Sequence, residues 1–407
     1  MKLTGPFTQI LPLLGMPLKG AITDDQLRVI PEGGVLTENG VVKAIENFEK
    51  LRKANPHIPI DKINGSMVLI PGFIDCHTHL CFAGNRANDY ALRLSGQTYR
   101  QIAASGGGIW DTVVQTRNAG EKQLTDLLLA RVQGHLSEGV TTIEVKSGYG
   151  LNAREELKQL RAIRVADTLT PAHLVPTCLA AHLLPKDFNH IATEYLAHLV
   201  SDLLPQIQRE ELANRVDIFV EEGAFTIGNA QYYLSEAKRM GFDLTVHADQ
   251  FTTGGSAVAV KTGAASADHL EASAETECKL LAGSNTAAVV LPGASLGLGM
   301  PFAPARKLLD AGACLAIASD WNPGSAPMGD LLTQAALLGA AERLTTAETL
   351  AGLTYRAAQA LRLDDRGTLT TGMLADMQAY PCADYREILY YQGKMKPARV
   401  WKNGKSL

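Results

Sequence analysis

The chain has few cysteines, no excess of charge of one sign, and no cysteine pair at close spacing. Its six cysteines are scattered among 407 residues, and no Cys-x-x-Cys occurs. This spacing argues against a zinc ribbon or a disulfide framework and favours a reducing, cytoplasmic setting. The formal net charge is only −4. A balance this close to neutral gives no electrostatic reason to expect binding to nucleic acid or to an anionic membrane surface.

Long hydrophobic runs and internal repeats are also missing. No apolar stretch approaches the roughly 20 residues that a membrane helix needs. Near the N-terminus, the apolar residues 10–14 are interrupted by Pro12 and followed by Pro17, and no cleavage site of small residues is obvious. We therefore interpret this stretch as a first strand and not as a signal peptide. The length and the 46% of hydrophobic residues suit a globular enzyme with one large and one small domain.

Both ends of the chain are typical of short strands joined by tight turns. The apolar runs 35–37 and 41–45 flank Glu38-Asn39-Gly40, and Asn-Gly between two such runs predicts a β-hairpin. Residues 368–380 and 398–405 have the same character. We predict that residues 1–66 and 365–407 meet in one small composite β-sandwich domain. Two independent flaps are the alternative.

Between these ends, short apolar runs alternate with helical segments, which is the pattern of βα units. The candidate strands are residues 67–76, 140–146, 173–180, 216–221, 243–248, 265–269, 286–292 and 313–319. Eight such units predict a (β/α)8 TIM barrel over residues 67–364. A doubly wound open sheet is the rival fold, but no Gly-x-Gly-x-x-Gly follows the first strand.

A pair of histidines follows the first barrel strand. Side chains alternate between the two faces of a strand, so His77 and His79 should point the same way, and Cys76 and Thr78 the other way. Two imidazoles on one face can share a metal ion. Two polar residues simply leaving a strand would be the ordinary explanation, so the interpretation depends on what the other strand ends carry.

Three further strands end in polar side chains of the same kind. His247 and His269 come at the ends of strands five and six, and Asp320 follows strand eight. The carboxyl ends of barrel strands converge on one face, and a cluster of nitrogen and oxygen ligands there suits catalytic Zn²⁺ or Fe²⁺. Such a metal activates water, and a neighbouring carboxylate can move the proton. The pattern therefore predicts a hydrolase or a deaminase.

At this point the chain resembles the amidohydrolase superfamily, and within it the imidazolonepropionase family of histidine degradation. The motifs that carry the resemblance lie between about residues 67 and 377. They are residues 72–80 with 82–86, the glycines 106–108, Glu144-Val145-Lys146-Ser147-Gly148-Tyr149-Gly150-Leu151, Ala180-Ala181-His182, His247-Ala248-Asp249-Gln250, Ala267-Asp268-His269-Leu270-Glu271, residues 291–294, and Asp320-Trp321-Asn322-Pro323-Gly324-Ser325.

The resemblance implies a ligand set and catalytic roles. His77, His79, His247 and Asp320 would hold one divalent metal per chain, Zn²⁺ or Fe²⁺, with Mn²⁺ as a further candidate. Asp320 would also be the general base, and His269 would orient water or stabilise the developing oxyanion. Binuclear relatives use a lysine at the end of strand four, which residues 218–222 lack. Lys146 on strand two is interpreted as a structural or ion-pairing residue.

The resemblance also implies a substrate and the residues that bind it. The reaction would be the ring opening of 4-imidazolone-5-propanoate to N-formimidoyl-L-glutamate, and Arg86 would pair with the propionate, since its fork suits a carboxylate. Gln250 would face the heterocycle and is also a catalytic candidate. The other substrate-binding candidates are Tyr99, Tyr149, His182, Asn322, Gly324 and Ser325. Individually, each could have a structural role, for example Arg86 in a surface ion pair.

The identity of the substrate is left open by two loops. The loops 295–302 after strand seven and 251–255 after strand five depart from the family pattern, and both would line the rim of the pocket. Another metal-dependent cyclic-amide hydrolase, or a deaminase or deiminase acting on a carboxylate such as N-formimidoyl-L-glutamate, is therefore the alternative activity. An inactive barrel that serves as a binding module is the alternative from a different class. It should have lost metal ligands, and this chain keeps them.

A homodimer is expected only because the superfamily resemblance implies one.

Overall fold

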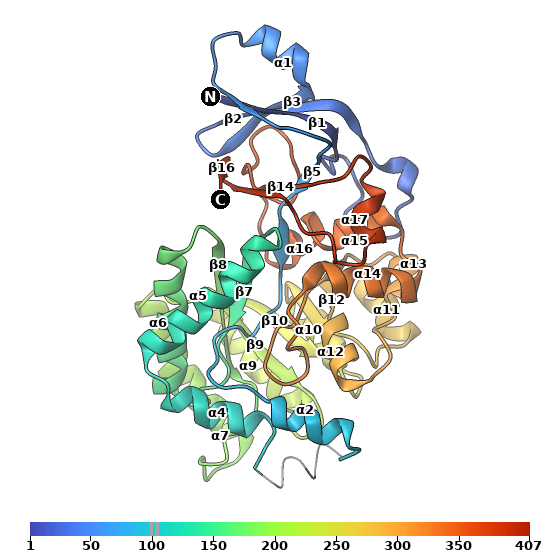
Figure 1. Ribbon diagram of the computed structural model, residues 1–407. Helices are drawn as coiled ribbons and strands as arrows, with labels where there is room; N and C mark the ends of the chain where they lie inside the picture. Colours follow the sequence, from blue (N-terminus) through green and yellow to red (C-terminus); the bar gives the residue numbers. More distant parts are fainter. Residues whose placement is uncertain (98–100, 102–105) are drawn as a thin grey trace.

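The computed structural model describes residues 1–97, 101 and 106–407. The larger of its two parts is a barrel of parallel strands surrounded by helices, in the lower half of Figure 1. The strands follow one another around the barrel in chain order: β6 (Phe73–Asp75), β7 (Val140–Lys146), β8 (His173–Ala181), β9 (Arg215–Val220), β10 (Asp243–Ala248), β11 (Ser266–His269), β12 (Ala287–Val290) and β13 (Leu315–Ile317). The predicted barrel is confirmed, and each strand overlaps its predicted range.

The first and last strands meet just beyond their carboxyl ends. The backbone N–H of Asp320 donates to the carbonyl of His77 over 3.0 Å, and that of His79 donates to the carbonyl of Trp321 over 3.0 Å. Thr78 and Trp321 form a parallel bridge. These contacts bring the segment after β6 beside the segment after β13 and nearly close the barrel.

Both faces of the barrel strands are buried, which explains their continuous apolar runs. Ile74, Val289 and Ala316 belong to one buried cluster, which reaches Leu361 after α16 (Tyr355–Ala360). Phe73, Val290 and other neighbours along the strands belong to a larger cluster that includes residues of the surrounding helices. Successive side chains thus pack on opposite faces, as the twofold period of a strand requires.

The remaining helices occupy the segments between strands. They are α1 (Phe48–Ala54), α2 (Ala87–Leu94), α4 (Ile109–Asn118), α5 (Glu121–Ser137), α6 (Ala153–Leu169), α7 (Ala192–His198), α8 (Leu204–Arg209), α9 (Ile227–Arg239), α10 (Gly255–Thr262), α11 (Glu275–Ala282), α12 (Pro292–Leu298), α13 (Ala305–Ala311), α14 (Leu331–Glu342), α15 (Thr346–Gly352) and α17 (Arg386–Tyr390). A 3₁₀ turn covers Asp24–Gln26, and a π-helical turn, Leu199–Leu203, links α7 to α8. The helical segment between β8 and β9 is therefore interrupted by a change of helix type.

Both chain ends contribute to the second sheet, which lies above the barrel in Figure 1. Its strands are β1 (Lys2–Ile10), β2 (Ile30–Glu38), β3 (Val41–Asn47), β4 (Ile60–Lys62), β5 (Val68–Pro71), β14 (Met377–Tyr380), β15 (Arg399–Lys402) and β16 (Lys405–Ser406). The predicted hairpin is present between β2 and β3. Its turn residues Asn39 and Gly40 have φ of 51° and 83°, as a type I′ turn requires.

The stretch expected to be the first barrel strand, residues 67–76, belongs to both sheets. Its first half, β5, pairs with β1 and β14, and its second half, β6, pairs with β7. Gly72 lies at the break, where a Cβ would come within 2.5 Å of the Thr141 hydroxyl. One continuous run of chain therefore ties the two parts together, and the exact division at residue 66 stays a prediction.

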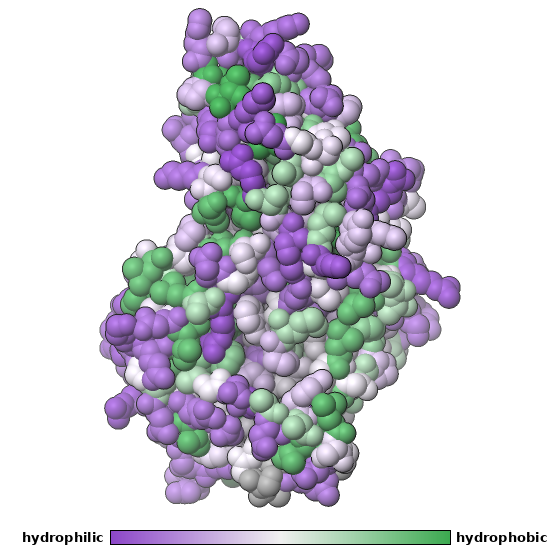
Figure 2. Space-filling view, viewed as in Figure 1, coloured by the Kyte–Doolittle hydropathy of each residue, from purple (hydrophilic) through white to green (hydrophobic). Residues whose placement is uncertain are grey.

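The surface has mixed polarity. On the face seen in Figure 2, hydrophilic side chains predominate at the end that carries α1, and hydrophobic ones lie in patches over the barrel. No helix in the described part of the chain combines the length and the apolar character that crossing a membrane requires.

Candidate metal centre at the carboxyl end of the barrel

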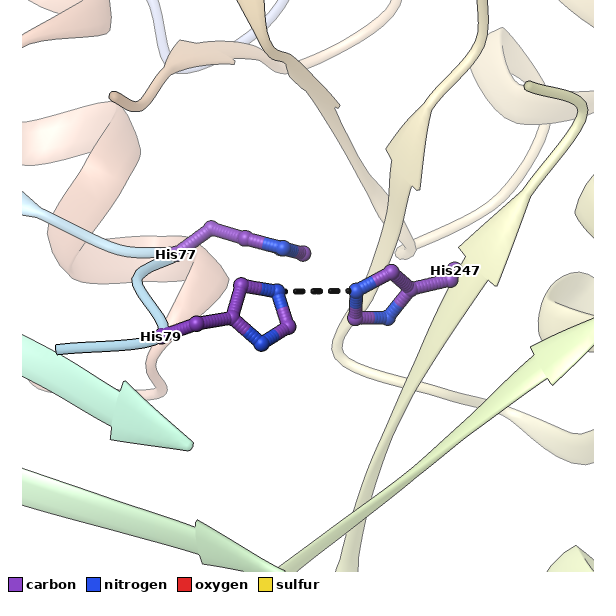
Figure 3. A group of neighbouring side chains, drawn as sticks. All are labelled: His77, His79 and His247. Atoms are coloured by element: carbon purple, nitrogen blue, oxygen red, sulfur yellow. Dashed lines mark hydrogen bonds between the residues drawn. The ribbon is translucent and has the colours of Figure 1, made fainter. Parts of the chain in front are cut away.

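Three histidines converge at the carboxyl end of the barrel. His77 and His79 come from the segment after β6, and His247 points at them from β10 (Figure 3). All three are buried, and one nitrogen from each lies within 4.8 Å of the others. The alternation that predicted a common direction for His77 and His79 agrees with this placement.

Asp320 completes the cluster from the segment after β13. Its Oδ1 lies 3.3 Å from Nε2 of His79 and 3.5 Å from Nε2 of His77. Nε2 of His247 lies 3.2 Å from Nε2 of His79. Metal–nitrogen bonds of 2.0–2.1 Å in a tetrahedral zinc site place ligand atoms about 3.3 Å apart. The four residues therefore fit a single ion of this size.

The atoms that face each other in this cluster have no other partners. Nε2 of His77 and Oδ1 of Asp320 are buried and make no hydrogen bond within the described part of the chain. Buried polar atoms are normally satisfied, and an ion bound between them would satisfy both. Burial lowers the pKa of His79 and of His247 to about 3, so both are neutral at pH 7, the form that binds a metal.

Two aspartates contact the Nδ1 atoms of two of the histidines. Nδ1 of His77 lies 2.7 Å from Asp268, and Nδ1 of His247 lies 2.9 Å from Asp217. A carboxylate at Nδ1 fixes the proton there, so that the lone pair of Nε2 points into the cluster. Sequence analysis missed the role of both aspartates. The available signal was a charged residue within the apolar strands β9 and β11.

His269 lies at the edge of the cluster, at the end of β11. Its ring centroid is 5.3 Å from that of His247 and 5.8 Å from that of His77. Its Nδ1 is 3.5 Å from Oε2 of Glu271. Burial alone would lower the pKa of His269, but Glu271 and the nearby aspartates raise it above its ordinary value. This setting favours the protonated ring, which can donate a hydrogen bond.

The loops after β10 and β12 each hydrogen-bond a glutamate near the end of a barrel strand. Ser295 in α12 donates to Oε1 of Glu271 over 3.1 Å. After β10, the backbone N–H groups of Phe251 and Thr252 donate to Glu221 over 2.9 and 3.1 Å. The loop after strand seven therefore reaches His269 through one side chain, which the sequence pattern did not reveal.

The backbone is in an unusual conformation at two of these residues. His269 has φ of 88°, and Asp320 has φ of 51°. Residues other than glycine rarely adopt positive φ, and such positions cluster at functional sites. His269 ends β11 and Asp320 follows β13, so both lie where the chain leaves a barrel strand.

Arg86 lies at the start of α2, between two loops. Its Nε donates to Asp89 over 2.8 Å, and the same Asp89 oxygen accepts from the N–H of Gly108 over 2.8 Å. A Cβ added to Gly324 would clash with Nη1 of Arg86. The guanidinium is therefore held next to the loop after β13 and is mostly buried, which differs from a surface ion pair.

The loop after β13 is organised by Asn322. Its amide nitrogen donates to the carbonyl of Asp320 over 2.7 Å, and its oxygen accepts from the N–H groups of Gly324 and Ser325 at 2.7 and 2.8 Å. The hydroxyl of Ser325 donates to Oδ2 of Asp320 over 3.4 Å. Asn322 and Ser325 are thus joined to Asp320 by hydrogen bonds, and Gly324 is joined to it through Asn322.

Two further substrate-binding candidates, Tyr149 and His182, lie beside His79. Tyr149 and His182 are buried, with ring centroids 6.0 and 5.5 Å from that of His79. Nδ1 of His182 is 3.0 Å from the carbonyl of Gly148. Gln250 is buried just after β10, two residues after Ala248. Tyr99 lies outside the described residues.

Known proteins that are similar to this chain include amidohydrolases and imidazolonepropionases. The model of the amidohydrolase family matches residues 68–407. An imidazolonepropionase of Symbiobacterium thermophilum is 40% identical over 408 residues, which cover 98% of this chain and 95% of that protein. An imidazolonepropionase of Myxococcus xanthus is 44% identical, covering 82% of this chain and 80% of that protein.

Solved structures support the fold at low identity. An atrazine chlorohydrolase from Arthrobacter aurescens, complexed with zinc, has a TM-score of 0.72 at 17% identity, covering 100% of this chain and 95% of that one. An adenosine deaminase from Xanthomonas campestris with bound zinc has a TM-score of 0.71 at 18% identity, covering 100% and 92%.

Proposed function

The chain belongs to the amidohydrolase family, and from this membership and the geometry of its site we propose that it is an imidazolonepropionase. It opens the ring of 4-imidazolone-5-propanoate with water and gives N-formimidoyl-L-glutamate in histidine degradation. The observation that carries the proposal is the convergence of His77, His79, His247 and Asp320 at the carboxyl end of the barrel, in a chain that is similar to imidazolonepropionases over most of its length.

In this proposal, His77, His79, His247 and Asp320 hold one divalent ion, which is Zn²⁺ or Fe²⁺, with Mn²⁺ as a further candidate. The ion would lower the pKa of a bound water to about 7 and so supply a nucleophile at neutral pH. One ion is expected because binuclear relatives use a lysine at the end of strand four, which residues 218–222 lack.

Asp320 moves the proton of the reaction. The water oxygen forms a bond to the ring carbonyl carbon, and the bond between that carbon and the ring nitrogen breaks. Asp320 accepts the water proton and delivers it to the departing nitrogen. In the metal-free site, burial raises the pKa of the Asp320 carboxyl above its ordinary value.

His269 and Gln250 act on the heterocycle. His269 donates a hydrogen bond to the carbonyl oxygen as negative charge develops there, an electrostatic contribution that is often large. Its pairing with Glu271 keeps the ring oriented for this task. Gln250, after β10, faces the ring atoms and selects for their hydrogen-bonding pattern.

Arg86 anchors the propionate of the substrate. Asp89 fixes its Nε, and a bidentate pair between the guanidinium and a carboxylate would add both energy and geometry. The remaining substrate contacts in the proposal come from Tyr99, Tyr149, His182, Asn322, Gly324 and Ser325.

The setting and the assembly are also part of the proposal. All six cysteines are buried and free, which supports a reducing cytoplasm. A homodimer, which the resemblance implies, stays a prediction that light scattering on the purified protein would test.

Turnover of freshly generated 4-imidazolone-5-propanoate tests the activity directly. We expect N-formimidoyl-L-glutamate to accumulate without release of ammonia, because ring opening consumes only water. N-formimidoyl-L-glutamate offered as substrate should not react. Ammonia release from either compound would instead identify a deaminase or a deiminase.

Metal analysis tests the ligand set. We expect about one tightly bound divalent transition metal per chain, and His247→Ala should lose both the metal and the activity because one of the convergent nitrogens is gone. Elemental analysis of both preparations decides the question. Two ions per chain, or full occupancy in His247→Ala, would contradict the proposed centre.

A further inference from the structure

A lysine lies beneath the metal centre, in the interior of the barrel. Lys146 on β7 is fully buried, and its ammonium contacts three carboxylates. Nζ lies 2.7 Å from Glu144, 2.9 Å from Asp217 and 3.9 Å from Asp268. Glu144 is on β7, Asp217 on β9 and Asp268 on β11, and all three are buried as well.

Each of these carboxylates holds a segment that carries a metal-ligand candidate. Asp268 contacts Nδ1 of His77, and Asp217 contacts Nδ1 of His247. Glu144 accepts from the backbone N–H of Thr78 over 3.2 Å, and Thr78 lies between His77 and His79. The single ammonium of Lys146 is therefore shared by the supports of all three histidines.

The same carboxylates are bound to the backbone and to nearby hydroxyls. The N–H of His247 donates to Oδ1 of Asp217 over 3.2 Å. The hydroxyl of Thr245 donates to Oδ2 of Asp268 over 3.0 Å. The N–H of Lys146 itself donates to the carbonyl of Thr78 over 3.0 Å. The lysine and the histidine segments thus form one connected network within the barrel.

Stability alone does not account for this lysine. Burying an ammonium and carboxylates costs several kcal/mol per ion, and replacing such a group with apolar side chains is often neutral or stabilising. The carboxylates are needed because they orient the imidazoles, and support of this kind typically changes metal affinity by 10–100-fold. Carboxylates packed this closely repel one another unless a cation lies between them.

We propose that Lys146 is the positioning residue of the metal centre. Its ammonium holds Glu144, Asp217 and Asp268 together, and through them it sets the orientation of His77, His79 and His247 toward the ion. The inference rests on the proposed function, because it concerns the same metal-dependent site. It goes beyond that function by giving this site a permanent internal cation that touches neither the ion nor the substrate.

Lys146→Met tests the proposal, since methionine keeps much of the length of the side chain and removes the charge. We expect the variant to bind Zn²⁺ 10–100-fold more weakly in competition with a chromophoric chelator. Its Co²⁺-substituted form should show altered d–d absorption bands, because the ligand geometry has changed. A folded variant with affinity within threefold of the parent chain and an unchanged Co²⁺ spectrum would overturn the proposal.

The matched control is Lys402→Met. Lys402 is another buried lysine, and it pairs with Asp376 at 2.5 Å in the terminal sheet. Removing it should lower the free energy of unfolding and leave the Zn²⁺ affinity and the Co²⁺ spectrum unchanged. Equal losses of affinity in the two variants would mean that Lys146 acts only through stability, and the proposal would fail.

A second variant covers the case in which Lys146→Met does not fold. Lys146→Met combined with Glu144→Gln removes one cation and one anion, so the buried net charge is preserved. This double variant should fold and still bind Zn²⁺ at least 10-fold more weakly, because Asp217 and Asp268 have lost their cation. Parent-like affinity in the double variant would overturn the proposal. If the parent chain itself bound no metal, the proposed function would fail instead.

Discussion

At the scale of single residues, the two oxygens of Asp320 have different surroundings. Oδ1 faces His77 and His79 at 3.5 and 3.3 Å, where a shared ion would lie. Oδ2 accepts from the hydroxyl of Ser325 over 3.4 Å, on the side of the loop after β13. Ligand and base are therefore separable functions of one side chain.

Asp320→Asn should separate these two functions. The amide keeps the shape and one oxygen that can bind a metal, but it cannot accept the water proton. We expect a sizeable share of the metal to remain and kcat to fall roughly 10²–10⁴-fold, the usual contribution of a general base. Metal content and rate must be measured on the same preparations.

His269→Gln is the companion variant, because the His269 side chain lies beside the cluster and not within it. It should keep the metal and lower kcat, with less effect on folding. If metal-loaded Asp320→Asn turned over within a few-fold of the parent chain, the base would have to be another group, and His269 would be the next candidate.

Arg86→Met should weaken binding of the transition state by about 2–4 kcal/mol, the lower part of the cost of truncating one partner of a buried charge pair. The change removes the proposed partner of the propionate while keeping most of the side-chain length. Comparing kcat/KM for the substrate and for an analogue without the carboxylate isolates this contribution. Equal losses for both compounds would show that Arg86 has a different role.

The sequence predicts the histidines of this site but not their supports. A histidine at the end of a strand is conspicuous, because apolar residues surround it in the sequence. Asp268 and Asp217 are charged residues within strands, and each contacts a histidine that comes from a different part of the barrel. Only the arrangement of the barrel shows that Asp268 meets His77, which precedes it by 191 residues.

At the scale of elements, strand periodicity located the barrel strands but could not show which sheet each half of a strand joins. Residues 67–76 form one apolar run, yet β5 pairs with β14 and β6 pairs with β7. Both halves are buried, so the pattern is the same on each side of Gly72. The pairing depends on tertiary contacts that composition does not encode.

The loop after β13 should not tolerate even a methyl side chain at Gly324. Gly324 has no positive φ, so alanine fits its backbone, but the added Cβ would lie 3.1 Å from Cζ of Arg86 and clash with Nη1. We expect Gly324→Ala to displace the guanidinium and raise KM about 10-fold or more, with little change in the free energy of unfolding. Steady-state kinetics and chemical denaturation together test this expectation.

Gly228→Ala in α9 is the matched control, because its Cβ would meet only the Thr226 hydroxyl at 4.0 Å. This change should leave KM unaltered and stabilise the fold by about 0.4–1 kcal/mol, as expected for alanine in a compatible helical position. An unchanged KM in Gly324→Ala would place Arg86 farther from the substrate than we propose.

At the scale of the whole molecule, the composite sheet could be predicted because both ends share a strand character that the middle lacks. The order of its strands could not, because β5 lies between β1 and β14, and so joins residues from the two ends. The networks around the metal centre likewise depend on the closed barrel, which brings the segments after β6 and β13 together.

The stability of the metal-free protein should depend on pH through its buried histidines. Burial lowers the pKa of His79, His182 and His247 to about 3 each, whereas an unfolded histidine titrates near 6.5. Between these values each of these three histidines binds more protons in the unfolded chain than in the folded one, so its contribution to stability falls as pH decreases from 6.5. Each of the three should account for about 2 kcal/mol between pH 6.5 and 5. The raised pKa values of Asp268, His269 and Asp320 contribute in the opposite direction.

Denaturant unfolding in the presence of a chelator, at several pH values, measures this slope. His182→Gln should reduce the change of the free energy of unfolding with pH by the contribution of one histidine. The variant removes one buried imidazole that is not among the proposed metal ligands. His190→Gln is the control, since His190 is exposed and pairs with Glu194 at the surface, and it should leave the slope unchanged. An equal slope in His182→Gln would mean that the metal-free fold accepts a proton on His182 without losing stability.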